Sequence, residues 1–275
     1  MFKTRLLSGI ILVLIMFGTL YFGGLATLLM TGFISLVGVY ELMRIPKTQS
    51  RGMLILAEAV TVIFYILLGL GYSFASYQYL YLMLLSVFMM AIMCCYVAQY
   101  PKYRLLDAML PFFAFFYVAV MLSYIYQVRS LYNGGAYVVL VFLSAWGNDT
   151  CAYCVGVLFG KHKMSPKLSP KKSWEGFFGG IAGAALLGVG YAFIFGAVTG
   201  ETVTAALVVV FAAICGIGGL ISVVGDLAAS AIKREFDIKD YGKLIPGHGG
   251  ILDRFDSMIM TAPIVYYLVT TFVIK

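Results

Sequence analysis

Apolar stretches long enough to cross a membrane recur along almost the whole chain of 275 residues. A membrane-spanning helix needs about 20 mostly apolar residues. Only 11% of the residues are charged, whereas soluble domains carry about 25%. The sequence therefore predicts an all-α, polytopic membrane helix bundle. The nine expected transmembrane helices are Leu6–Phe22, Leu25–Met43, Met53–Leu70, Gln78–Ala98, Ala108–Gln127, Ala136–Phe159, Gly176–Val198, Val203–Ala229 and Ile251–Val273.

The lysines and arginines indicate how these helices are oriented. If the N-terminus is cytoplasmic, 17 of the 19 basic residues fall on the cytoplasmic side, and only Arg129 and Lys275 fall opposite. Basic residues are enriched in cytoplasmic loops. We therefore expect an integral protein of a bacterial inner (cytoplasmic) membrane, with its N-terminus and active site on the cytoplasmic side. The net charge of +7 then reflects membrane topology, and no nucleic-acid partner is expected.

The helices are expected to form two parts. Residues 1–135 would supply about five N-terminal spans, and residues 136–275 a catalytic bundle of about four spans with cytoplasmic loops 161–175 and 232–250. Small residues four apart let membrane helices approach closely; glycines recur at this spacing in the seventh span and are frequent in the eighth. The five cysteines lie inside apolar stretches, so no disulfide framework is predicted.

One polar stretch, Gly225–Asp256, interrupts the apolar pattern. It holds six of the twelve carboxylates and one of the two histidines. Asp226 and Ser230 are four residues apart, so they share one face of a helix. Asp226 and Asp253 would lie at the cytoplasmic edges of neighbouring spans, where two carboxylates could hold Mg²⁺ together with substrate phosphates. Alternatively, each carboxylate pairs with a nearby lysine or arginine.

Other residues of this stretch also have two interpretations. Asp256 could complete the metal site or pair with Arg254. The turn from Pro246 to Gly250 could present backbone N–H groups to phosphate oxygens at a helix N-terminus, and His248 within it could contact pyrophosphate, serve as an acid or be structural.

A second polar segment precedes the seventh span. Lys171 and Lys172 could neutralise the charge of a triphosphate, or be ordinary interfacial lysines. Glu175 would start the next helix, where a carboxylate is favoured, as a cap or as a group that orients a ligand. An aspartate within a membrane helix is a functional candidate, which applies to Asn148-Asp149. We expect Glu41 at the membrane interface, and the deeper Glu58 has no interpretation.

The motif SAIKREFDIKDYGKLIPGHGGILDRFD, the 27 residues from Ser230 to Asp256, resembles the signature of the phosphatidate cytidylyltransferases (CDP-diacylglycerol synthases). A second block, SPKKSWEG from Ser169 to Gly176, is similar to another motif of that family. Length and hydrophobic layout resemble the family along the whole chain.

The resemblance implies a reaction in which CTP and phosphatidic acid give CDP-diacylglycerol and pyrophosphate in phospholipid biosynthesis. It implies Mg²⁺, with a second, monovalent cation left open, contact with membrane lipids, and a homodimer. The implied metal ligands are Asp226 and Asp253, with Asp256 as a further candidate. The implied catalytic residues are Asp226, Asp253, Lys171, Lys172 and His248. The substrate-binding candidates are Ser173, Glu175, Ser230, Lys233, Arg234, Lys239, Asp240, Gly247, Gly249, Gly250 and Arg254.

Two alternatives remain at this point. Another CTP-using lipid or polyprenol transferase or kinase would share the location but lack the complete signature. A secondary transporter would carry an intramembrane carboxylate pathway and repeated halves, whereas the charges here cluster at one side of the expected membrane. Transport without turnover of CTP would favour the transporter.

Overall fold

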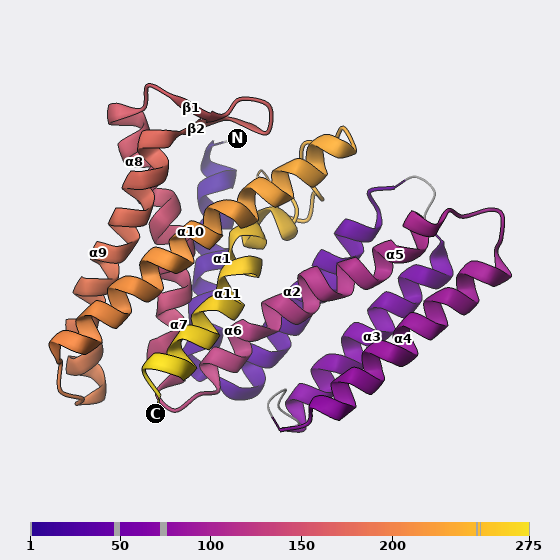
Figure 1. Ribbon diagram of the computed structural model, residues 1–275, viewed down its shortest axis with the longest axis horizontal. Coiled ribbons are helices and arrows are strands. Elements are labelled where there is room, and N and C mark those ends of the chain that lie inside the picture. The colour runs from indigo at the N-terminus through magenta and orange to yellow at the C-terminus, as the bar shows by residue number, and fades with distance from the viewer. Residues whose placement is uncertain (1, 47–49, 72–75, 246, 248, 275) are drawn as a thin grey trace. The chain divides into compact units, whose positions relative to one another are not determined.

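The computed structural model describes residues 2–46, 50–71, 76–245, 247 and 249–274, which are almost entirely helical (Figure 1). The α-helices are α1 (Phe2–Phe22), α2 (Gly24–Met43), α3 (Arg51–Gly69), α4 (Gln78–Ala98), α5 (Leu105–Ala114), α6 (Met121–Arg129), α7 (Gly134–Phe142), α8 (Asn148–Phe159), α9 (Trp174–Thr199), α10 (Ala205–Glu235) and α11 (Leu252–Phe272). Two π-helical segments, η1 (Phe115–Val120) and η2 (Leu143–Gly147), join α5 to α6 and α7 to α8.

The predicted all-α, polytopic membrane fold is confirmed. Within the described residues, eight helical segments are long and apolar enough to cross a membrane, and α1 adds a shorter apolar helix, Gly9–Phe22. Leu105–Arg129 and Gly134–Phe159 each form one span, with its π-helical segment in the middle. The eighth span differs from the prediction, because α10 continues past Ala229 to Glu235. The polar residues that follow Ala229 therefore start on a helix.

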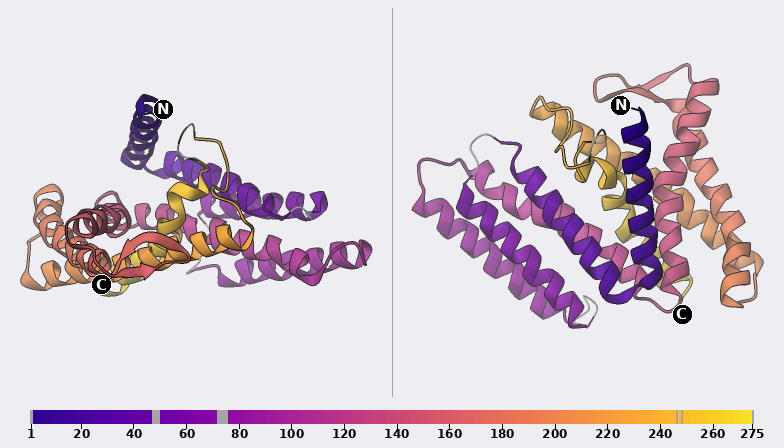
Figure 2. Two further views of the ribbon diagram at one scale, coloured as in Figure 1. Left: turned by 90° about the horizontal axis from the view of Figure 1, so that it is seen from above. Right: turned by 180° about the vertical axis from the view of Figure 1, so that it is seen from behind.

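A short β-hairpin occupies the segment that was expected to be a loop between the sixth and seventh spans. Strands β1 (Lys163–Ser165) and β2 (Ser169–Ser173) are antiparallel, with Lys163 opposite Ser173. Figures 1 and 2 show the hairpin beyond the ends of α8 and α9. It gives the basic segment a defined backbone.

The chain divides into two compact units. The first contains Met1–Ser123 and Ile238–Arg254, and the second contains Tyr124–Asp237 and Phe255–Lys275. The polar loop after α10 and the first residues of α11 thus belong with the N-terminal helices. The division of function between residues 1–135 and 136–275 stays a prediction.

The first unit is built on an aromatic core. The ring of Phe64 lies edge-on to Tyr81 and to Phe115, with centroids 5.6 and 5.5 Å apart. Phe115 meets Phe88 at 5.5 Å. Such edge-to-face pairs suit the quadrupoles of aromatic rings, and they hold α3, α4 and η1 together.

The second unit depends on close approach between helices, as the glycine spacing predicted. A Cβ atom at Gly179 of α9 would lie 2.6 Å from the side chain of Val155 of α8, and one at Gly180 would lie 2.7 Å from Oδ1 of Asn148. On α10, a Cβ atom at Gly225 would lie 2.8 Å from the carbonyl oxygen of Asp256. The polar residues on α8, α10 and α11 are therefore held close together by glycines.

This packing predicts a specific sensitivity in α9. Gly179→Ala should destabilise the protein by about 1–3 kcal/mol, because the added methyl group overpacks the contact with Val155. Gly190→Ala is the matched control, since a Cβ atom there meets nothing within 4 Å. The thermal unfolding midpoint of the purified protein in detergent measures both. Equal midpoints for the two variants would contradict the close α8–α9 packing.

Candidate active site

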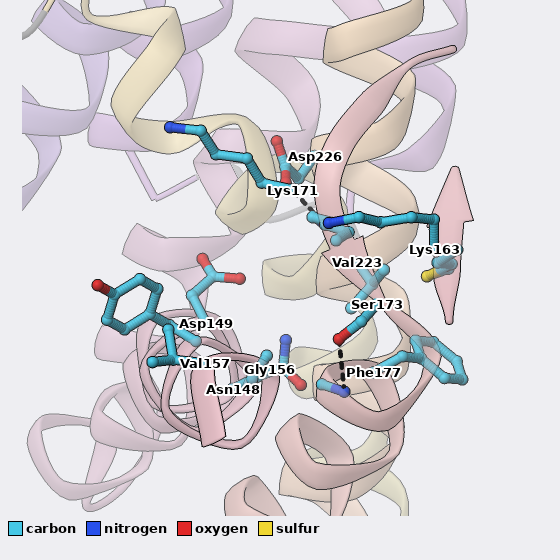
Figure 3. Close-up of a pocket in the computed structure, with 15 residues that line it drawn as sticks. Asn148, Asp149, Gly156, Val157, Lys163, Lys171, Ser173, Phe177, Val223 and Asp226 are labelled. Atoms are coloured by element: carbon cyan, nitrogen blue, oxygen red, sulfur yellow. Dashed lines mark hydrogen bonds and ion pairs between the residues drawn. The ribbon is translucent and has the colours of Figure 1, made fainter. Parts of the chain in front are cut away.

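A cavity of about 470 Å³ in the second unit collects residues from three separate polar motifs (Figure 3). It lies between α8, the hairpin, the start of α9 and α10. Its lining includes Asn148, Asp149, Lys163, Lys171, Lys172, Ser173, Phe177, Val223 and Asp226. The structure therefore brings Lys171 and Lys172 beside Asp226, as a phosphate and metal site requires.

Lys172 and Asp226 form an ion pair across this cavity. The Nζ atom lies 2.5 Å from Oδ2, and the side chains are 23% and 30% exposed. This pairing is one of the two interpretations that the sequence left open for Asp226. The Nζ atom itself is buried, so the ion pair must open before a cation can reach the carboxylate and an anion can reach the lysine.

Two further carboxylates surround Asp226. Asp149 and Asp256 each interact electrostatically with Asp226, and the positive charges beside the group are Lys172 and Lys233. Asp256 is 9% exposed, and its Oδ1 accepts the N–H of Ser257 at 2.8 Å. Three carboxylates therefore lie close to one another, and a divalent cation would relieve their mutual repulsion.

The carboxylates around Asp226 fit a Mg²⁺ site in which the substrate supplies some of the metal ligands. Among the described residues, no group of three or more His, Cys, Asp or Glu side chains is placed to hold a metal ion by itself. Mg²⁺ commonly binds one or two carboxylates and takes its other ligands from substrate phosphates and water. The carboxylates around Asp226 meet this requirement for one or two protein ligands.

The glycine-rich turn lies in the first unit and is closed by a backbone hydrogen bond from Ile245 N–H to the carbonyl of Gly249, 3.0 Å. Gly247 and Gly249 have φ angles of 78° and 91°, a region that side chains disfavour. Glycine is therefore required at both positions by backbone conformation. Pro246 and His248 lie outside the described residues.

Asp253 is tied to this loop. Its Oδ2 accepts the N–H groups of Tyr241 and Gly250, at 2.8 and 3.0 Å, and the residue is 9% exposed. The carboxylate is thus held in place by two charge-assisted hydrogen bonds. Asp226 belongs to the second unit.

A second, larger cavity of about 1050 Å³ separates α2 from the loop in the first unit. Lys239 and Asp240, two of the substrate-binding candidates, are exposed in its wall. Phe33, Val37, Tyr40, Glu41, Arg44, Ile45, Ile238, Tyr241, Gly242, Lys243 and Leu244 complete the lining.

The remaining candidates differ in their surroundings. Ser230 follows Asp226 by one turn of α10 and is partly exposed, and Arg234 is exposed near the end of that helix. Lys233 interacts electrostatically with Asp256. The Nε of Arg254 is buried and has no hydrogen-bond partner among the described residues, which leaves a donor for an anionic ligand.

Ser173 and Glu175 both have partners at the start of α9. Ser173 Oγ accepts the N–H of Gly176 at 3.2 Å and caps the helix. Glu175 accepts the backbone N–H of His162 at 3.2 Å, and its Oε1 lies 2.6 Å from Nδ1 of the same histidine. These contacts tie the hairpin to α9, and the roles of both residues toward substrate stay predictions.

The contacts of His162 with Glu175 and of Glu41 with the start of α11 were not predicted from the sequence. Glu41 was expected at the membrane interface, with no partner assigned; its side chain is buried, 6% exposed, and accepts from the backbone of Ile251 and Leu252 at the start of α11. No local spacing could reveal this contact, because the partner residues lie more than 200 positions later in the chain. The one signal was a carboxylate near the end of an otherwise apolar span.

The fold and the cavity define a class of protein: a membrane helix bundle in which acidic and basic groups gather at one end of the helices in the second unit. A profile of the Cytidylyltransferase family matches residues 3–272. The chain therefore belongs to the cytidylyltransferase family, and the resemblance seen in the sequence is confirmed.

Its relatives include proteins named phosphatidate cytidylyltransferase. The one from Staphylococcus epidermidis is 32% identical over 266 residues, covering 97% of this chain and 98% of the relative. The one from Bacillus subtilis (strain 168) is 30% identical over 272 residues, covering 98% of each. That from Staphylococcus aureus (strain COL) is 29% identical, with 97% and 98% covered.

The contacts of Glu175 predict that it holds the hairpin to α9. Glu175→Ala should speed trypsin cleavage after the lysines between Lys161 and Lys172, because His162 loses its contacts with the Glu175 carboxylate and keeps only the backbone bond from Trp174. Glu235→Ala, at the exposed end of α10, is the control. Limited proteolysis with mass spectrometry measures the rates. Unchanged cleavage in Glu175→Ala would show that the hairpin is held by other contacts.

Proposed function

We propose that this chain transfers the cytidylyl group of CTP to phosphatidic acid and releases pyrophosphate, giving CDP-diacylglycerol for phospholipid biosynthesis. The observation that carries the proposal is the cavity in which Lys171, Lys172 and Asp226 meet. The full-length likeness to phosphatidate cytidylyltransferases supports the choice of substrates.

The reaction is a phosphoryl-type displacement. An oxygen of the phosphatidate phosphate attacks the α-phosphorus of CTP, the bond to the β-phosphate bridge breaks, and pyrophosphate leaves with the electron pair. The attacking group is already anionic, so no protein nucleophile is needed. Catalysis then consists of positioning and charge neutralisation. Lys171 and Lys172 would bind the triphosphate and neutralise the charge that moves to the leaving group.

The Lys172–Asp226 ion pair suggests how the charges of the site are compensated before substrate binds. Lys172 neutralises Asp226, and substrate would draw the lysine to a phosphate oxygen. The resemblance assigns Asp226 and Asp253 as Mg²⁺ ligands, with Asp256 as a further candidate, and the question of a monovalent cation stays open. Bound Mg²⁺ would neutralise phosphate charge and align the reacting oxygens.

The location follows from the substrates. The lipid is in the bilayer and the nucleotide is in the cytoplasm, so we place the N-terminus and the site on the cytoplasmic side of a bacterial inner membrane, in agreement with the distribution of basic residues. The homodimer implied by the resemblance belongs to this proposal as well.

The proposal predicts a reaction with three requirements. The purified protein in detergent should release pyrophosphate only when CTP, phosphatidic acid and Mg²⁺ are all present. Asp226→Asn and Asp253→Asn should each lower the rate by about 100-fold or more, because each removes the charge of a proposed Mg²⁺ ligand. Coupled pyrophosphate detection measures the rates, and thermal unfolding verifies that the variants are folded.

Asp237→Asn is the matched control. Asp237 is exposed and has a φ angle of 52°, which asparagine tolerates. A folded, lipid-supplied wild type that releases no pyrophosphate would overturn the proposed function. Activity that survives both aspartate changes would instead overturn the assignment of the metal ligands.

A further inference from the structure

Glu41 makes two hydrogen bonds that join α2 to the start of α11. Its Oε1 accepts the N–H of Ile251 at 3.1 Å, and its Oε2 accepts the N–H of Leu252 at 2.9 Å. All three residues belong to the first unit. Both carboxylate oxygens are therefore committed to the backbone at one helix terminus.

This contact meets a need that the local sequence leaves unmet. The first N–H groups of a helix have no partner within the helix, and they carry partial positive charge. A serine, threonine, aspartate or asparagine just before the helix usually accepts from them. Here Gly250 and Ile251 precede Leu252, and neither has a side chain that can accept. The buried carboxylate of Glu41 supplies the acceptors instead.

The loop glycines reveal how closely Glu41 is enclosed. A Cβ atom at Gly250 would lie 2.5 Å from both carboxylate oxygens of Glu41, and one at Gly242 would overlap the same carboxylate. Neither glycine has a positive φ angle, unlike Gly247 and Gly249. The signature thus needs glycine for two separate reasons: backbone conformation at Gly247 and Gly249, and space for Glu41 at Gly242 and Gly250.

The same loop holds Asp253. Gly250 adjoins the amides that Glu41 binds, and its own N–H donates to Asp253, as does the N–H of Tyr241. Glu41 and Asp253 therefore accept hydrogen bonds from adjacent peptide groups, those of Gly250, Ile251 and Leu252. A shift of Gly250 and Ile251 away from Glu41 would carry the Gly250 N–H, one of the two donors to Asp253, with it.

We propose that Glu41 is a positioning residue of the cytidylyl transfer reaction: it holds Gly250 and Ile251 against the first turn of α11 and so sets the orientation of the Asp253 carboxylate. Glu41 acts through Asp253 and the backbone. Its kinetic test rests on the proposed function, in which Asp253 holds Mg²⁺.

The kinetic test compares Glu41→Gln and Glu41→Asp with wild type. Glutamine keeps the size of the side chain but turns one acceptor into an NH₂ group that faces a backbone N–H. Groups that orient a metal ligand typically affect activity 10–100-fold. We expect kcat to fall by about that factor in Glu41→Gln, with a higher Mg²⁺ concentration for half-maximal activity. Glu41→Asp keeps both acceptors and should recover part of the loss.

Glu235→Gln, an exposed carboxylate at the end of α10, is the control for charge and should behave as wild type. A reduced fraction of folded protein would lower kcat without moving the Mg²⁺ dependence. An unchanged Mg²⁺ dependence in a folded Glu41→Gln would therefore overturn the positioning role. An inactive wild type would instead overturn the proposed function.

A stability test needs no catalysis. Gly242→Ala in the wild type should lower the thermal unfolding midpoint, because the new methyl group displaces the Glu41 carboxylate. In a Glu41→Ala background, the same glycine change should have little further effect, since the space is empty. Coupling of this kind is expected only for residues in contact.

Gly52→Ala serves as the matched control in the same unit, because a Cβ atom there lies 3.7 Å from its nearest neighbour, Ser50 Oγ. It should change the midpoint equally little in both backgrounds. Additive effects of Gly242→Ala and Glu41→Ala would overturn the contact on which the inference stands.

Discussion

A carboxylate buried at the end of an apolar helix is stable only where backbone N–H groups or an opposite charge compensate it. Glu41 and Asp253 are compensated by two backbone N–H groups each. Asp226 is compensated by Lys172. Hydrogen bonds to charged groups contribute about 1.5–3 kcal/mol each, so these contacts stabilise the positions of the three carboxylates and of the segments that bind them.

The two kinds of compensation have different consequences for catalysis. A carboxylate held by backbone amides is fixed in position, as a metal ligand or a structural clamp must be. A carboxylate paired with a lysine can exchange that partner, because the lysine side chain is long and flexible. The second unit thus offers an exchangeable site at Asp226, and the first unit offers a rigid one at Asp253.

Much of this protein could be predicted from its sequence. The apolar stretches located the membrane helices, and the glycine spacing of the seventh span predicted its close packing. The end of α10 at Glu235 was missed because Lys233 and Arg234 were assigned to the polar loop 232–250, although their side chains are compatible with a helix that leaves the membrane. The β-hairpin was missed because two short strands of mostly polar residues carry no clear periodicity.

The site was predictable where its residues are neighbours in sequence. Lys171 and Lys172 lie in one motif, and Asp226 and Ser230 share a helix face, so both local relations could be predicted. The contact between Lys172 and Asp226 joins separate motifs and required the fold. The contact of Glu41 with α11 joins residues far apart in the sequence. Because it is made to backbone N–H groups, it does not constrain the type of the partner residues, and only the glycines beside Glu41 reflect it.

The central claim is that the cytidylyl group, and not the terminal phosphate, moves to the lipid. Purified protein in phosphatidic acid-containing vesicles should be given CTP labelled in either the α- or the γ-phosphate, with Mg²⁺. The account predicts that the α-label appears in the extracted lipid while the γ-label appears only in pyrophosphate. Recovery of the γ-label in the lipid would contradict the account and identify a CTP-dependent lipid kinase instead.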